Sequence, residues 1–236
     1  NLVNLINGAD EWAIKSYEEA VKLEPLNPIT YTQWGLIYLN RADALTDDKE
    51  KTEERAQIMN MAREKFQKAL DLKSDYAPAR YQLAMIDIRD GKTKDAITKL
   101  EDTKIIAPYD TGLSFQLGLV YRADNQNDKA QAEFERTIAL DPNYSNARYF
   151  LGLIYDENKE TAKAIDQFEQ IAKLNPDDAT VKKILENLKA GKPALEGVTQ
   201  AQEPPIQENR RINYRFRLRF RVRLRKSRDF KPKKSF

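Results

Sequence analysis

The stretch TGLSFQLGLVYRADNQNDKAQAEFERTIALDPNY, residues 111–144, is followed at once by a variant of itself, SNARYFLGLIYDENKETAKAIDQFEQIAKLNPDD, residues 145–178. The residues that recur at this spacing are Gly118 and Gly152, Tyr121 and Tyr155, Phe134 and Phe168, the alanines Ala96, Ala130 and Ala164, and the prolines Pro108, Pro142 and Pro176. A fixed period of 34 residues is typical of stacked helix-turn-helix units. The sequence therefore predicts an all-α solenoid, a fold that works by displaying a surface.

Each unit is expected to hold two helices joined by a polar turn. In residues 111–144 the second helix should stop at Asp141-Pro142, because proline disfavours helix in the residue before it. Glycine within a helix costs roughly 1 kcal/mol relative to alanine, so the recurrence of Gly118 indicates a packing requirement. We expect such small residues to let two helices approach closely while large ones, such as Phe134, fill the space beside them.

These residues resemble the tetratricopeptide repeat. That family places a large residue at position 4, Leu and a small residue at 7 and 8, Tyr at 11, Ala at 20, Phe or Tyr at 24, Ala at 27 and Pro at 32. An earlier unit matches the first four of these positions with Tyr31, Trp34, Gly35 and Tyr38. The resemblance extends over about Leu2 to Lys189 and implies a right-handed superhelical solenoid of antiparallel helix pairs.

The repeat positions divide the chain into eight segments. They are a partial unit at 1–27 that consists mainly of its second helix, a unit with an insertion of about 15 residues at 28–76, regular units at 77–110, 111–144 and 145–178, a capping helix at 179–191, a linker at 192–208 and a non-globular basic tail at 209–236. The insertion predicts a taller hairpin, with Asp47 and Glu50 as a reciprocally capped helix start.

The partial unit indicates a fragment of a larger protein. Only Leu2 to Ile6 would remain of its first helix, while Ala13, Tyr17, Ala20 and Pro25 match a second helix. We expect the apolar stacking face of this unit to be uncovered, and to pair with a missing repeat or with another chain.

Composition excludes several classes of site. The chain has no Cys and no His, which rules out Cys/His zinc sites, thiol catalysis, disulfides and His-based triads. No glycine-rich loop is placed to hold a phosphate, so we predict no catalytic, cofactor-binding or metal-binding residue and no enzymatic activity. No apolar run approaches the roughly 18 residues that span a bilayer. A cytoplasmic and a membrane-associated bacterial location both stay open.

The family resemblance also implies a binding groove. First helices of tetratricopeptide units line a concave surface, and the matching positions here are Thr32, Leu36, Tyr81, Met85, Arg89, Phe115, Leu119, Arg122, Tyr149 and Leu153. Such a groove suits an extended or helical peptide with apolar anchors. Core packing is the alternative role for its aromatic residues. A carboxylate-binding clamp is not expected, because leucine occupies the position where that subtype carries a polar residue.

The tail differs in charge from everything before it. Residues 209–236 carry a net charge of +12, and the rest of the chain carries −9. From Tyr214 to Arg225 apolar residues and arginines alternate, which as a strand would put them on opposite faces. The candidate contacts with nucleic acid or membrane are Arg215, Phe216, Arg217, Arg219, Phe220, Arg221, Arg223 and Arg225.

Three interpretations of the tail stay open. Alternating basic and aromatic residues suit RNA or single-stranded DNA. An apolar face beside a cationic one suits an anionic membrane surface. The third is a low-complexity tail without function, which a shifted reading frame could also produce.

The function predicted from the sequence is a protein-interaction scaffold that binds a peptide or partner domain. An adaptor that binds nucleic acid or anionic membrane through residues 209–236 is the alternative. The blocks at 7–28 and 184–197 further resemble repeat regions of bacterial multi-span membrane proteins, such as polymerase- or ligase-like proteins of surface polysaccharide assembly.

Overall fold

The structure, a computed structural model, describes residues 2–45 and 49–198. Within these residues it contains ten α-helices, one short 3-10 helix and no strand, so the predicted all-α fold is confirmed. The elements are α1 (Leu2–Leu23), α2 (Pro28–Ala44), η1 (Lys49–Lys51), α3 (Thr52–Leu72), α4 (Ala77–Arg89), α5 (Thr93–Ile106), α6 (Thr111–Ala123), α7 (Asn127–Leu140), α8 (Ser145–Glu157), α9 (Thr161–Leu174) and α10 (Ala179–Lys189). The predicted tail at 209–236, with its alternating segment, lies outside the described residues.

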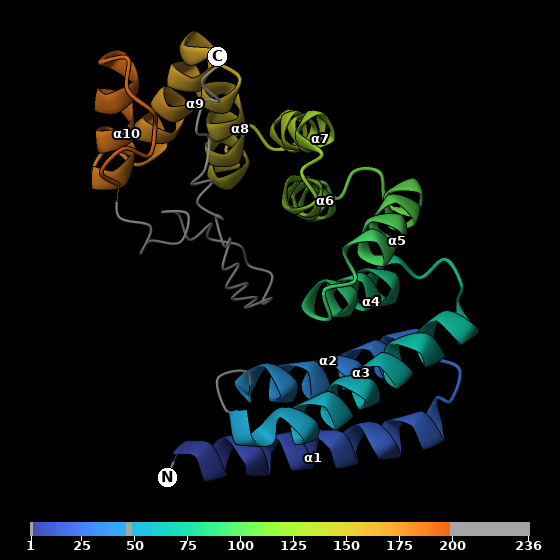
Figure 1. The fold of residues 1–236 in the computed structure, drawn as a ribbon. Helices are drawn as coiled ribbons and strands as arrows, with labels where there is room; N and C mark the ends of the chain where they lie inside the picture. Colours follow the sequence, from blue (N-terminus) through green and yellow to red (C-terminus); the bar gives the residue numbers. More distant parts are fainter. Residues whose placement is uncertain (1, 46–48, 199–236) are drawn as a thin grey trace, which may run out of the picture.

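Successive helices pack as antiparallel pairs that follow one another along an arc (Figure 1). The pairs are α2 with α3, α4 with α5, α6 with α7, and α8 with α9. Figure 1 shows α4, α6 and α8 on the inner side of the arc and their partners on the outer side. The array ends at α1 on one side and at α10 on the other, so each internal pair has neighbours on both of its faces.

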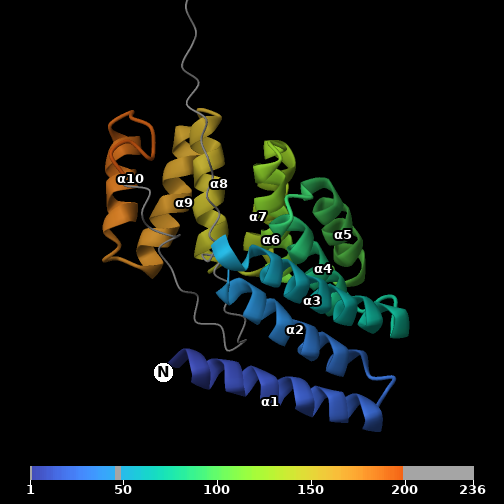
Figure 2. The same ribbon diagram turned by 60° about the horizontal axis from the view of Figure 1, so that its bottom comes forward.

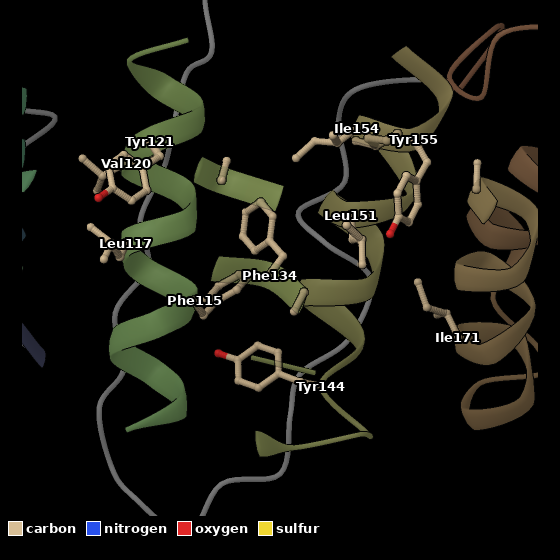
Figure 3. Packing of buried hydrophobic residues seen from close by; sticks show 14 of the residues in the cluster. Phe115, Leu117, Val120, Tyr121, Phe134, Tyr144, Leu151, Ile154, Tyr155 and Ile171 are labelled. Atoms are coloured by element: carbon tan, nitrogen blue, oxygen red, sulfur yellow. The ribbon is translucent and has the colours of Figure 1, made fainter. Parts of the chain in front are cut away.

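A phenylalanine ring lies against a glycine in three of the four pairs. The pairs of residues are Gly35 with Phe66, Gly118 with Phe134, and Gly152 with Phe168. A Cβ atom added at any of the three glycines would lie 2.7 Å from a carbon of the facing ring. All three rings are fully buried. In Figure 3 the ring of Phe134 lies between α6 and α8. Glycine is required because the ring occupies the space that a side chain would fill.

The fourth pair solves the same packing problem with different residues. Ala84 stands at the glycine position of α4, and Leu100 stands at the phenylalanine position of α5. Both residues are fully buried. A smaller side chain on the second helix therefore accompanies a larger one on the first, which keeps the volume between the helices filled.

The turn within each regular pair uses one residue in the left-handed region. Gly91, Asn125 and Lys159 occupy the same repeat position, with φ values of 74°, 61° and 65°. Glycine and asparagine adopt this conformation readily, and lysine does so at a cost. Side-chain caps begin α6 and α10: the Asp110 carboxylate accepts from the Leu113 amide at 2.8 Å, and Asp178 accepts from the amides of Thr180 and Val181. α4 and α8 begin without such a cap.

The insertion lengthens both helices of the first complete pair. α2 has 17 residues where α4, α6 and α8 have 13, and α3 has 21 where α5, α7 and α9 have 14. The predicted helix start differs from the structure. Glu50 lies in η1, α3 begins only at Thr52, and Asp47 lies outside the described residues.

α1 corrects a second expectation. The sequence predicted a break after Ile6, but the structure has one continuous 22-residue helix from Leu2 to Leu23. A glycine inside a helix costs roughly 1 kcal/mol, which does not by itself force a break at Gly8. In the described residues no helix packs against the far side of α1 to favour a turn there.

The segment after α10 closes the other end of the array. Ala194 is buried, and its carbonyl accepts a hydrogen bond from the Asn187 side-chain amide at 3.0 Å. The same amide donates to the Glu196 carbonyl at 2.7 Å, and the Ala194 amide donates to Asp156 at 2.9 Å. Residues 192–198 of the predicted linker thus fold back onto α8 and α10.

The glycine–ring contact predicts the behaviour of a double variant. We expect Gly118→Ala alone to destabilise the protein by about 1 kcal/mol, because overpacking against Phe134 outweighs the gain in helix propensity. In a Phe134→Leu background the same change should be neutral or stabilising, since this recreates the pair Ala84 and Leu100. Urea unfolding followed by circular dichroism at 222 nm measures the coupling, and strictly additive effects would contradict the proposed contact.

Candidate interaction surface

The predicted groove residues come from the first helices of the four pairs. Thr32 and Leu36 lie on α2, and the other eight are divided among α4, α6 and α8. In the structure they fall into three groups: buried residues, half-buried apolar residues, and two arginines that form ion pairs.

Four of the ten residues are buried, namely Thr32, Met85, Phe115 and Leu153. Phe115 is only 7% exposed, and its ring centroid lies 4.9 Å from that of Tyr144 and 5.8 Å from that of Phe134. Figure 3 shows the three rings close together. Thr32 donates its hydroxyl to the Pro28 carbonyl at 2.9 Å. The structure therefore assigns these four side chains mainly to core packing.

The half-buried apolar members are Leu36, Tyr81, Leu119 and Tyr149. Tyr81, Leu119 and Tyr149 pack against the core and still keep part of their surface exposed. The Tyr149 ring meets the Phe150 and Phe168 rings edge-on, with centroids 5.6 and 5.7 Å away. Burial raises the pKa of the Tyr149 hydroxyl. These contacts fix the tyrosine while leaving an apolar surface.

The two arginines bind carboxylates of neighbouring first helices. The Arg89 guanidinium contacts Asp43 on α2 through two bonds, Nε to Oδ1 at 3.1 Å and Nη2 to Oδ2 at 2.9 Å. Arg122 contacts Glu157 on α8, with Nη2 at 2.6 Å from Oε1. Each arginine thus links two inner helices, a role that the sequence analysis did not foresee.

A second set of contacts missed by the sequence analysis joins each pair to the one before it. The Tyr155 hydroxyl on α8 donates to Glu135 on α7 at 3.0 Å. Tyr121 on α6 donates in the same way to Glu101 on α5, and the Lys189 ammonium on α10 contacts Glu169 on α9 at 2.8 Å. In every case the glutamate precedes its donor by 20 residues, which is a sequence signal that could have been found.

α4 departs from this scheme. Asp87 occupies the repeat position of Tyr121 and Tyr155, and Gln67 occupies the position of their glutamate partners. The tyrosine–glutamate hydrogen bond is therefore replaced at this junction. Asp87 is buried, and it is paired instead with Lys99 at 2.7 Å and with Arg63 at 3.5 Å. Arg63 also contacts Asp90 at 2.6 Å. A charged network therefore joins α3, α4 and α5, where the other junctions pair a glutamate with a tyrosine or, at α10, with a lysine.

Residues 2–45 and 49–198 contain no group of three or more acidic residues arranged to hold a metal ion. None of the helices described combines the length and the apolar character needed to cross a membrane.

Comparisons with known proteins identify the fold. Residues 115–179 match the sequence model of the tetratricopeptide repeat. Solved structures with similar folds include MamA from Desulfovibrio magneticus RS-1 (23% identity, 74% of this chain and 90% of that chain covered, TM-score 0.58) and YrrB (21%, 78% and 89%, 0.58). PilF of Pseudomonas aeruginosa is also similar (17%, 78% and 77%, 0.59). No curated protein sequence matches the chain. The fold is therefore an all-α solenoid of the tetratricopeptide type.

The tyrosine–glutamate contacts predict that the protein loses stability as the pH rises above about 10. Burial and the neighbouring Glu135 carboxylate raise the pKa of Tyr155 to about 12, against about 10 in an unfolded chain. The folded state therefore favours the protonated hydroxyl. The contribution of the protonated Tyr155 hydroxyl to the free energy of unfolding is complete below about pH 10. It is lost as pH rises from about 10 to 12, and the free energy of unfolding falls by at most about 1.4 kcal/mol per pH unit.

Tyr155→Phe should reduce that slope, because the variant has no hydroxyl to ionise at this site. Urea unfolding at several values between pH 9 and pH 12 measures it. Tyr109→Phe is the matched control, since Tyr109 is largely exposed. Equal slopes for Tyr155→Phe and the unmodified protein would contradict a raised pKa at Tyr155.

Proposed function

We propose that the inner face of the array binds a segment of another protein, with Tyr81, Leu119 and Tyr149 as its apolar contacts. One observation carries this proposal. These three side chains come from the successive inner helices α4, α6 and α8, and each stays partly exposed while packing on the core. Aromatic and aliphatic side chains held in place by a rigid core are suited to act as anchors in protein recognition.

The chemistry of the face favours apolar anchors over an acidic segment. Arg89 and Arg122, the two cationic residues predicted there, already bind Asp43 and Glu157. An incoming carboxylate would have to compete with these pairs. A segment whose large apolar residues reach Tyr81, Leu119 and Tyr149 meets no such competition.

The comparisons support the general role. YrrB is described as a tetratricopeptide protein with an unusual peptide-binding site. Proteins with this fold are typically scaffolds without catalytic activity, and we propose no catalytic role for this chain. The adaptor function of residues 209–236 stays a prediction from the sequence, because no described residue bears on it.

The larger context is a separate proposal. The resemblance of residues 7–28 and 184–197 to repeat regions of bacterial multi-span membrane proteins supports attachment of this array to such a protein, as its interaction module. Detection of the native protein by antibody in detergent-extracted membranes would support attachment. Recovery only in the fraction released by salt washing would count against it.

A selected peptide tests the inner face. We expect 12-residue peptides selected from a phage-displayed library on the full chain to lose at least about tenfold in affinity, or about 1.4 kcal/mol, with Tyr81→Ala/Leu119→Ala. Isothermal titration calorimetry measures the affinity, and circular dichroism verifies that the variant is folded. Lys94→Ala/Thr98→Ala, on the exposed side of α5, is the matched control and should bind normally. Unchanged binding by the inner-face variant would move the site elsewhere.

A further inference from the structure

We propose that the open face of α1 is a docking site for one amphipathic helix from outside the described residues, with glycine facing Tyr17. This inference does not depend on the inner-face proposal, because α1 carries none of the predicted groove residues. It rests on a comparison of α1 with the second helices of the complete pairs.

Three positions of α1 differ in burial from their equivalents. The equivalent sets are Ala62, Phe66 and Ala69 in α3; Ala130, Phe134 and Thr137 in α7; and Ala164, Phe168 and Ile171 in α9. Every one of these nine residues is 0% exposed. Their counterparts in α1, Ala13, Tyr17 and Ala20, are only half-buried. α1 thus carries the packing residues of a second helix without the contacts that bury them elsewhere.

The uncovered side of α1 faces away from the array. Figure 2 shows α1 at one end with α2 on one side and no other helix of the described chain beyond it. α2 is the helix against which α1 packs. The opposite end is closed, since Val181, Ile184 and Leu188 of α10 are buried together with Ala194. Among residues 2–45 and 49–198, α1 is therefore the end helix whose outer face no other helix covers.

The array itself shows what covers such a face. Phe66, Phe134 and Phe168 each lie against the glycine of an antiparallel helix, at a distance that excludes a Cβ atom. The ring of Tyr17 is as wide as theirs. A helix that buried Tyr17 in the same way would need glycine at the contact, as Gly152 provides for Phe168.

Trp12 provides a second anchor. It is 73% exposed and lies at the repeat position of Lys129 and Lys163. The ammonium groups of those lysines lie 5.1 and 5.2 Å from the ring centroids of Tyr121 and Tyr155 on the partner helix. Each of those tyrosines follows its glycine by three residues. A docked helix with an aromatic residue at that spacing would therefore bring a ring to Trp12.

A second copy of the chain fits this face less well. Gly35, Gly118 and Gly152 already contact their own phenylalanine rings. The glycine within α1, Gly8, is nine residues from Tyr17, or about two and a half helical turns, and lies on the opposite side of the helix. Two α1 helices in contact would therefore present larger residues to each Tyr17. A separate helix with its own glycine avoids that clash.

The probe is a synthetic peptide with the sequence of α8, residues 145–157, acetylated and amidated at its ends. A side-chain staple joins positions 146 and 150 to hold it helical. The Phe150 ring lies against Phe115 and Phe134, and the staple leaves Tyr149 and Gly152, which face Phe168 of α9, unchanged. The peptide is titrated into the full chain, and tryptophan emission reports on Trp12. The Trp12→Phe variant shows which part of the emission change comes from Trp12, since the other tryptophan, Trp34, is already buried.

We expect a saturable blue shift of the emission. A peptide with Gly152→Leu should bind at least tenfold more weakly, and so should the Tyr17→Ala protein with the original peptide. If Tyr17→Ala fails to fold, the two peptides still decide the matter on the unmodified chain. Equal binding of both peptides, no shift up to 1 mM peptide, or dimerisation of the chain that shields Trp12 without peptide would overturn the proposal.

Discussion

The close contact between a glycine on one helix and a phenylalanine ring on its partner is the constraint on which the structure depends. Gly35, Gly118 and Gly152 leave room for the rings of Phe66, Phe134 and Phe168, and each ring is completely buried as a result. This contact sets how near the helices of a pair can come. Ala84 with Leu100 meets the same constraint by exchanging volume between the two sides, so the contact specifies a filled space more than a particular pair of residues.

Polar contacts join these apolar pairs to one another. Hydrogen bonds and ion pairs between donors on α6, α8 and α10 and glutamates on α5, α7 and α9 hold each pair to its predecessor. The junction at α4 uses the buried carboxylate of Asp87 and two cations instead. On the inner side, Arg89 links α4 to α2 and Arg122 links α6 to α8, which are neighbouring first helices. Because Arg89 and Arg122 are already paired within the array, we base the proposed partner surface on its apolar residues.

Much of the fold could be predicted because the repeated residues are those with the strictest packing requirements. Gly118 and Phe134 recur as Gly152 and Phe168 because the glycine leaves the space that the ring fills, and the 34-residue spacing shows this recurrence directly. The site was harder to predict. Phe115 was placed in the groove by its repeat position, but Tyr144 and Phe150 cover it, and they come from the following segment of chain. Arg89 and Arg122 find partners at different repeat positions, so periodicity gave no warning. The break expected in α1 is absent because a turn needs a packed partner helix as well as a glycine.

The central claim is tested most directly by the proton chemical shifts of the glycine α-protons. An α-proton held against the face or edge of an aromatic ring experiences its ring current. The account predicts that Gly35, Gly118 and Gly152 show strongly displaced α-proton shifts and nuclear Overhauser contacts to the ring protons of Phe66, Phe134 and Phe168, whereas Gly91 and Gly191, which have no such neighbour, do not. Ordinary shifts and no ring contacts at the first three glycines would contradict it.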